Sequence, residues 1–216
     1  MRLVVSHMIK VASFNINGIK ARLPRLLEWL EETRPSVACL QEIKTQDEGF
    51  PAAEFEKIGY HAIWHGQKSF NGVAILVDGA APTEVQRGLP GDDTDEQARW
   101  IEATVIGRRV VRVCGLYLPN GNPAPGPKYD YKLAWMARME ARAKALLTLE
   151  EPTVFCGDYN VIPQDADAAK PELWQTDALA LPASRAAYRR LMALGLTDAF
   201  RARNAAAGQY TFWDYQ

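Results

Sequence analysis

The sequence has few of the residues that most redox and zinc sites need. Only three of its 216 residues are cysteine and three are histidine. The cysteines all lie inside apolar runs, which predicts buried, reduced thiols in a cytoplasmic protein. The histidines show no ligand spacing, so a zinc site is not expected. These six residues are Cys39, Cys114, Cys156, His7, His61 and His65.

Several other features are missing as well. No apolar run approaches membrane-spanning length, and no charged segment precedes an apolar one as in a signal peptide, so no membrane partner is expected. Gly-x-Ser-x-Gly, P-loop and Gly-x-Gly-x-x-Gly motifs are also lacking. The sequence therefore gives no support for a serine nucleophile or for a nucleotide-binding site of these types. The net charge is −1, so a site for a polyanion must be local or built around a metal ion.

The length of the chain and its succession of predicted strands and helices indicate one domain of layered α/β structure over residues 8–216. Residues 1–7 precede a second methionine and are interpreted as a leader or an added segment. Apolar alternation and runs predict strands at residues 10–16, 37–40, 60–64, 72–77, 84–87, 99–106 and 110–118, and from 153. Helices are predicted from near Pro24 to Arg34, at 50–58 and 129–149, and from a cap at Ser184 to Gly195.

Polar side chains follow four of these apolar runs. Thr153–Asn160 is the clearest case, because a short apolar strand ends in Asp158 and Asn160, two residues apart. Residues two apart on a strand point the same way, so both could reach one spot. A lone Asp-x-Asn is also consistent with a simple turn. The other three runs end in Asn15 and Asn17, in Glu42, and in Tyr117 and Asn120.

These residue types favour a hard cation. Carboxylates and carboxamides suit Mg²⁺, which keeps several waters and binds few protein carboxylates. Mg²⁺ together with a carboxylate that can orient water is a combination suited to the hydrolysis of phosphoesters.

The sequence resembles exonuclease III, the bacterial apurinic/apyrimidinic endonucleases of the endonuclease–exonuclease–phosphatase superfamily, in four blocks: Ser13–Arg22, Leu40–Lys44, Tyr117-x-Pro119-Asn120-Gly121 and Gly157–Asn160. The Gln41-Glu42 and Gly157-Asp158-Tyr159-Asn160 blocks are shared across the superfamily. The blocks Asn17-Gly18-Ile19-Lys20-Ala21-Arg22 and Phe212-Trp213-Asp214-Tyr215 are typical of the DNA-repair branch. The resemblance implies two mixed β-sheets packed face to face and flanked by helices, a four-layer sandwich.

The resemblance also implies roles for the residues at the strand ends. Glu42 is expected to be the main metal ligand, with Asn15 completing the site or holding the phosphate. Asp158 is expected to activate water, Asn160 to bond the phosphate, and Tyr117 to assist the leaving group. Asp158 and Asn160 are counted in the expected metal set. The cofactor implied is Mg²⁺, for which Mn²⁺ may substitute.

The partner implied is double-stranded DNA with abasic sites or 3′ ends, bound by a monomer. Phe212 and Trp213 resemble the aromatic wall that packs against a flipped-out abasic sugar. Other segments resemble the DNA-backbone loops of the family and contain Lys20, Arg22, Phe70, Asn71, Arg99, Asn120 and Lys128. Arg25 and Lys132 are further candidates for a local basic surface.

The sequence departs from the family at its end. Family members continue beyond the aromatic block into two more strands, which carry an Asp and a closing Ser-Asp-His-Ala-Pro block. Either these 216 residues are part of a longer protein, or they form the whole molecule with an incomplete site and an open sheet edge. On either reading, the chain itself is expected to hydrolyse abasic DNA weakly or not at all. Two other functions stay open: a phosphatase for lipid or inositol headgroups, and a non-catalytic DNA-binding fragment.

Overall fold

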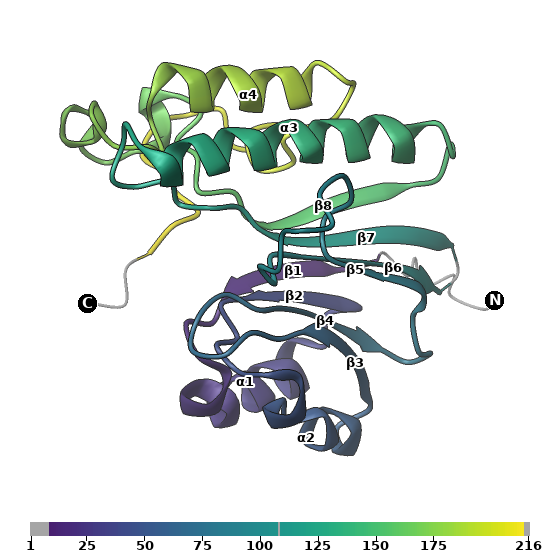
Figure 1. Ribbon diagram of the computed structural model, residues 1–216. Helices are drawn as coiled ribbons and strands as arrows, with labels where there is room; N and C mark the ends of the chain where they lie inside the picture. Colours follow the sequence, from purple (N-terminus) through teal and green to yellow (C-terminus); the bar gives the residue numbers. More distant parts are fainter. Residues whose placement is uncertain (1–8, 108, 214–216) are drawn as a thin grey trace. The chain divides into compact units, whose positions relative to one another are not determined.

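Residues 9–107 and 109–213 are described by a computed structural model of the chain (Figure 1). The chain divides into two compact units. Unit 1 consists of Met1–Tyr117 and Leu149–Asp158, and unit 2 of Leu118–Thr148 and Tyr159–Gln216. The predicted leader lies outside the described residues, and the single catalytic domain expected over residues 8–216 stays a prediction.

Unit 1 contains two four-stranded sheets, each with parallel and antiparallel pairs. The first sheet has the order β1-β2-β4-β3 and the second the order β5-β6-β7-β8. β1 runs parallel to β2, and β7 runs parallel to β8. The strands are β1 (Val11–Asn15), β2 (Val37–Gln41), β3 (Tyr60–His65), β4 (Val73–Asp78), β5 (Thr83–Arg87), β6 (Trp100–Ile106), β7 (Val110–Tyr117) and β8 (Thr153–Asp158).

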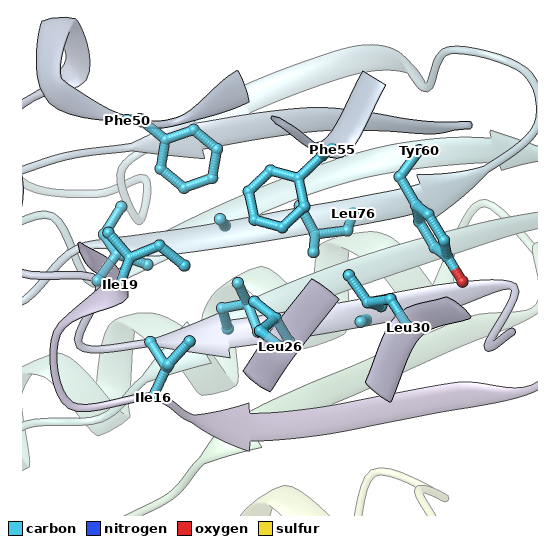
Figure 2. Close-up of a cluster of buried hydrophobic side chains, with 12 residues drawn as sticks. Ile16, Ile19, Leu26, Leu30, Phe50, Phe55, Tyr60 and Leu76 are labelled. Atoms are coloured by element: carbon cyan, nitrogen blue, oxygen red, sulfur yellow. The ribbon is translucent and has the colours of Figure 1, made fainter. Parts of the chain in front are cut away.

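The two faces of β2 show how unit 1 is layered. Ala38 and Leu40 point to one face and pack with helices α1 (Ile19–Thr33) and α2 (Ala52–Lys57). Figure 2 shows this cluster, in which Leu26 and Phe55 reach from the helices toward the sheet. Cys39 points to the opposite face, where the first sheet packs against the second. Alternation along the strand therefore separates a helix-covered face from the face between the sheets.

Helix α1 differs from its prediction at its start. It begins at Ile19, after Gly18, and Pro24 is its sixth residue instead of its entry. Proline cannot donate to the carbonyl of residue 20, so the helix lacks one main-chain hydrogen bond there. The buried side chains of Ile19, Leu26 and Leu30 nevertheless continue along one face, because burial against the sheet outweighs the lost bond.

Unit 2 is built around two helices that lie side by side, α3 (Pro127–Leu147) and α4 (Pro182–Met192) (Figure 1). The Arg190 guanidinium on α4 donates to Glu140 on α3 over 3.0 Å. The prediction that Ser184 caps α4 is wrong. Pro182 occupies the first turn, and the Ser184 hydroxyl instead donates to the main-chain oxygen of Ala178 over 2.6 Å.

The predicted pair of mixed sheets with flanking helices is confirmed, and the first seven strands lie within one residue of their expected bounds. Short 3₁₀ helices complete the described elements at Asp47–Gly49, Asp165–Asp167 and Pro171–Trp174. Within the described residues, no helix is both long enough and apolar enough to cross a membrane.

Candidate active site

The carboxyl ends of parallel strands carry the candidate residues of unit 1. Asn15 is the last residue of β1 and pairs with Gln41 of β2, directly before Glu42. Tyr117 and Asp158 are paired with each other at the ends of β7 and β8. Because paired parallel strands end on the same side of a sheet, each sheet presents two polar side chains at one edge.

The amide of Asn15 connects the two carboxylates of this site. Its Nδ2 donates to Oε1 of Glu42 over 2.8 Å and to Oδ2 of Asp158 over 3.0 Å. Its Oδ1 accepts the main-chain N–H of Asn17 at 3.2 Å, which holds the amide in this orientation. The carboxylates of Glu42, which directly follows β2, and of Asp158, at the end of β8, therefore accept from a single nitrogen atom.

Glu42 is held in its ionised form. Its Oε2 lies 2.9 Å from Nζ of Lys44, and Lys44 Nζ also donates to Oδ1 of Asn17 over 2.5 Å. Partial burial alone would raise the pKa of Glu42. The hydrogen bonds from Asn15, Lys44 and Tyr117 outweigh that effect and lower the pKa below its ordinary value. Glu42 is therefore negatively charged at neutral pH and suited to a cation.

Tyr117, in contrast to the ionised Glu42, keeps its proton and is neutral. Burial, the negative charge of Glu42 and the hydrogen bond to that carboxylate raise the pKa of Tyr117 well above its ordinary value. The guanidinium of Arg99 lies over the phenol ring, 4.8 Å from its centroid, and donates to the main-chain oxygen of Tyr117 over 3.2 Å. The phenol is therefore a neutral hydrogen-bond donor held by Arg99 on its face.

The backbone around this site is unusual in conformation. Asn17, Glu42, Lys44 and Asn71 all have positive φ angles, between 46° and 53°. The main-chain N–H of Lys44 donates to the oxygen of Asn71 over 3.0 Å, which supports these turns. Left-handed residues other than glycine cost free energy and gather at functional sites, so their clustering here supports the assignment.

Gly157 explains how Asp158 reaches its place. A Cβ atom at residue 157 would lie 1.9 Å from the main-chain oxygen of Leu116 on the neighbouring strand. Only glycine allows β7 and β8 to approach this closely just before the carboxylate.

Unit 2 contains Asn120 and Asn160, and their amides meet. Asn120 Nδ2 donates to Oδ1 of Asn160 over 3.4 Å, and Asn160 Nδ2 donates to the main-chain oxygen of Leu118 over 2.8 Å. β8 ends at Asp158, and Asn160 has a left-handed φ of 44°. Asn160 therefore lies beyond the end of β8. The alternation of side chains along a strand, which predicted that Asn160 and Asp158 point the same way, does not extend to it.

The remaining predicted DNA-binding residues have different surroundings. Lys20, Lys128, Phe70, Phe212 and Trp213 are exposed, the last three to 67%, 69% and 76%. Arg22 is partly buried and donates to the main-chain oxygen of Asn17 over 2.5 Å. Asn71 is buried, and its amide donates to Oε1 of Gln67 over 2.8 Å. Asp214 and Tyr215 of the aromatic block lie outside the described residues.

Two lysines have surroundings that differ from the sequence-based expectations. Lys44 was not assigned a role, although its place two residues after Glu42 in a polar turn could have indicated a partner for that carboxylate. Lys132 was grouped with an exposed basic surface, but its side chain is fully buried. Its burial has a sequence signal, since Lys132 shares the apolar face of α3 with Tyr129 and Met136, at i−3 and i+4.

The donor set of unit 1 fits a hard cation. Two facing carboxylates and a carboxamide are oxygen donors of the kind that Mg²⁺ takes, with water filling the remaining positions. Residues 9–107 and 109–213 contain no group of three or more His, Cys, Asp or Glu side chains placed to hold a metal. His65 instead points its ring nitrogen toward the main-chain oxygen of Trp100, at 3.5 Å.

Two solved structures are closely similar to the chain. An AP endonuclease from Archaeoglobus fulgidus matches with a TM-score of 0.90 and 35% identity, over 97% of this chain and 79% of that one. The 3′ phosphatase NExo from Neisseria, bound to a product DNA hairpin, matches with a TM-score of 0.91 and 36% identity, over 97% of this chain and 80% of that one.

The sequence comparisons agree. Exodeoxyribonuclease III of Haemophilus influenzae is 36% identical over 219 residues, which cover 96% of this chain and 81% of that protein. Residues 12–216 match the endonuclease/exonuclease/phosphatase family. With carboxylates and amides gathered at the strand ends, this chain belongs to the endonuclease/exonuclease/phosphatase family and, within it, to the hydrolases related to exonuclease III.

Proposed function

We propose that the chain is a Mg²⁺-dependent nuclease acting on double-stranded DNA, with Mn²⁺ as a substitute. In this proposal it hydrolyses the phosphodiester on the 5′ side of abasic sites and trims 3′ ends. The observation that carries the proposal is the Asn15 amide held between the carboxylates of Glu42 and Asp158. The relatives named exodeoxyribonuclease III and AP endonuclease support the substrate class.

In this proposal Glu42 is the main metal ligand, and Asn15 and Asp158 are the other protein ligands of the site. When bound, Mg²⁺ would supply positive charge that stabilises the negative charge developing on the phosphate. The lowered pKa of Glu42 keeps that ligand ionised without the metal. Lys44, as the present cation partner of Glu42, keeps the carboxylate oriented.

Asp158 and Tyr117 have complementary roles in the proposed hydrolysis. Asp158 accepts the proton of the attacking water or orients that water toward phosphorus. Tyr117, whose raised pKa keeps its proton on the phenol, donates a hydrogen bond to a phosphate oxygen or to the leaving oxygen. Arg99 fixes the ring of Tyr117 and adds positive charge beside it.

Local positive charge and exposed aromatic rings are the proposed means of binding DNA. Lys20 and Lys128 are exposed lysines able to reach phosphates, which makes binding salt-dependent despite the net charge of −1. Phe212 and Trp213 are exposed, as rings that stack on an extrahelical sugar or base must be. Asn120 and Asn160 are proposed phosphate-binding groups of unit 2.

The test is a comparison of substrates under excess enzyme. We expect slow cleavage, detectable with excess enzyme, of a duplex with one tetrahydrofuran abasic-site analogue, and no release of phosphate from an inositol phosphate. Release of inorganic phosphate from the inositol substrate, without DNA cleavage, would establish the phosphatase alternative instead. Binding of abasic duplex without turnover in Mg²⁺ or Mn²⁺ would establish the non-catalytic alternative. The expectations of a monomer, of a cytoplasmic location and of low activity stay predictions.

A further inference from the structure

Lys132 is a fully buried lysine in a helix whose other lysines are exposed. It is the sixth residue of α3, and its side chain has no solvent exposure, whereas Lys128 and Lys144 on the same helix are exposed. Lysine is rarely buried in proteins, because the ammonium loses its hydration. A buried ammonium therefore needs strong acceptors around it.

Two main-chain oxygens from separate loops meet the Lys132 ammonium. Nζ donates to the oxygen of Asn120 over 3.0 Å and to the oxygen of Asn160 over 2.5 Å. The Asn120 loop leaves the end of β7, and the Asn160 loop leaves the end of β8. One charged group thus connects the two loops of unit 2 that carry proposed phosphate-binding residues.

Gly121 fixes the stem of the same lysine. A Cβ atom at residue 121 would lie 2.6 Å from Cδ of Lys132 and 3.3 Å from its Cβ. Gly121 has a φ of 93°, which side-chain-bearing residues rarely adopt. The loop backbone therefore lies directly against the lysine stem, which leaves the ammonium few other positions.

The side chains of the two asparagines depend on this main-chain arrangement. Asn160 is left-handed, with a φ of 44°, and its Nδ2 donates to the main-chain oxygen of Leu118 over 2.8 Å. Its Oδ1 accepts from Nδ2 of Asn120 at 3.4 Å. Because Lys132 holds both main-chain oxygens, it fixes the direction in which each amide leaves its loop.

We propose that Lys132 is a positioning residue for the hydrolysis: its ammonium holds the Asn120 and Asn160 loops in the conformation in which their amides bind phosphate. This inference rests on the proposed function. Loss of a buried charge leaves its hydrogen-bond acceptors unsatisfied, so Lys132 also stabilises unit 2, and two of those acceptors are the main-chain oxygens of Asn120 and Asn160. Positioning of these loops affects the rate as well, since a displacement of about 1 Å lowers a rate by about 10²-fold.

The test uses Lys132→Met, which keeps the length of the stem and removes the charge. Lys144→Met is the matched control, because Lys144 lies on the same helix, is exposed and pairs with Glu140. Single-turnover cleavage of abasic duplex gives a maximal rate constant and a half-saturating enzyme concentration. Hydrogen–deuterium exchange gives the protection of residues 118–122 and 159–163 without requiring activity.

For Lys132→Met we expect a maximal rate constant lower by about 10²-fold, with a half-saturating concentration within about threefold of the wild type. Exchange should rise at least about tenfold in the two loops and stay unchanged in β2 and β4, while Lys144→Met resembles the wild type in both measurements. If Lys132→Met does not fold, Lys132→Gln carries the same two measurements. That substitution keeps a donor but no charge, and the same directions are expected.

Unchanged loop exchange in a folded variant, or an unchanged rate constant, overturns the inference. Exchange that rises equally throughout the chain also overturns it, because Lys132 would then be a general stabilising residue. If the wild type cleaves no DNA substrate, the proposed function fails separately, and loop exchange alone then decides whether Lys132 holds the two loops.

Discussion

The amide of Asn15 donates to the carboxylate of Asp158 over 3.0 Å, although 143 residues separate them in the sequence. The same nitrogen donates to Glu42, so one small side chain orients both acidic groups of the candidate site. Asn15 belongs to the first sheet and Asp158 to the second, and their contact lies where β1 and β8 run side by side in unit 1.

Replacing Asn15 tests this relationship. In Asn15→Ala both carboxylates lose a shared donor and repel each other without an intervening N–H group. We expect the single-turnover rate constant on abasic duplex to fall by about 10²–10³-fold, as when a donor of a catalytic centre is removed. Asn204→Ala is the control, because the Asn204 amide bonds only locally to the oxygen of Phe200 in the described contacts. A similar loss in both variants would contradict the assignment.

Tyr117→Phe has an expected effect on the pH profile as well as on the rate. The Tyr117 hydrogen bond helps to lower the pKa of Glu42, so its removal raises that pKa. Because activity requires ionised Glu42, the acidic limb of the pH–rate profile should move to higher pH. We also expect a rate constant lower by about 10²-fold at the plateau. An acidic limb that stays in place, or moves to lower pH, would show that Tyr117 does not act on Glu42.

Gly157→Ala tests the close approach of β7 and β8. The new Cβ would lie 1.9 Å from the oxygen of Leu116, so the strands must separate. We expect the free energy of unfolding to fall by about 3 kcal/mol or more, measured by urea denaturation. Gly79→Ala is the control, because nothing lies within 4 Å of a Cβ there and only backbone strain of about 1 kcal/mol is expected at its φ of 103°. Equal effects of the two substitutions would contradict this explanation.

Arg112 is a buried cation of unit 1. Its guanidinium contacts Glu84 at 2.7 Å, Glu151 at 3.0 Å and the fully buried Glu102 at 3.6 Å. Arg112→Met leaves Glu102 buried without this cation, and we expect the free energy of unfolding to fall by about 3–5 kcal/mol. Adding Glu102→Gln should recover part of that loss, as a double-mutant cycle would measure.

The exposed ion pair of Arg25 provides the control for Arg112. Arg25 and Glu28 lie 2.8 Å apart with side-chain exposures of 88% and 63%. Solvent screens such a pair, so Arg25→Met should change stability little. A larger loss from Arg25→Met than from Arg112→Met would contradict the reading of Arg112 as the structural cation.

The fold could be predicted from the sequence because it depends on local pattern, and so could the strand ends that carry the candidate site. Short apolar runs predicted the strands, and parallel pairing brought Asn15 beside Glu42 and Tyr117 beside Asp158. The bridging role of the Asn15 amide could not be predicted, because it depends on contact between two sheets whose strands are far apart in sequence.

The predictions for Ser184 and Lys132 differ from the structure for physical reasons. Ser184 has the residue type of an N-cap, but Pro182 set the start of α4 earlier and left the hydroxyl to bond Ala178. Lys132 was expected in solvent with other helix lysines, because charge alone does not reveal which carbonyl groups a tertiary contact will supply. Residues whose partners come from distant loops are the ones that local pattern cannot place.

The most direct test of the account is single-turnover cleavage of a duplex with one abasic-site analogue by the wild type and by Glu42→Gln. We expect an incision on the 5′ side of the analogue that requires Mg²⁺ or Mn²⁺ and stops with EDTA. Glu42→Gln keeps the shape of the side chain but not its charge, and should lower the rate constant by about 10³-fold. Equal incision by both proteins, or no incision by excess wild type with either metal, would contradict it.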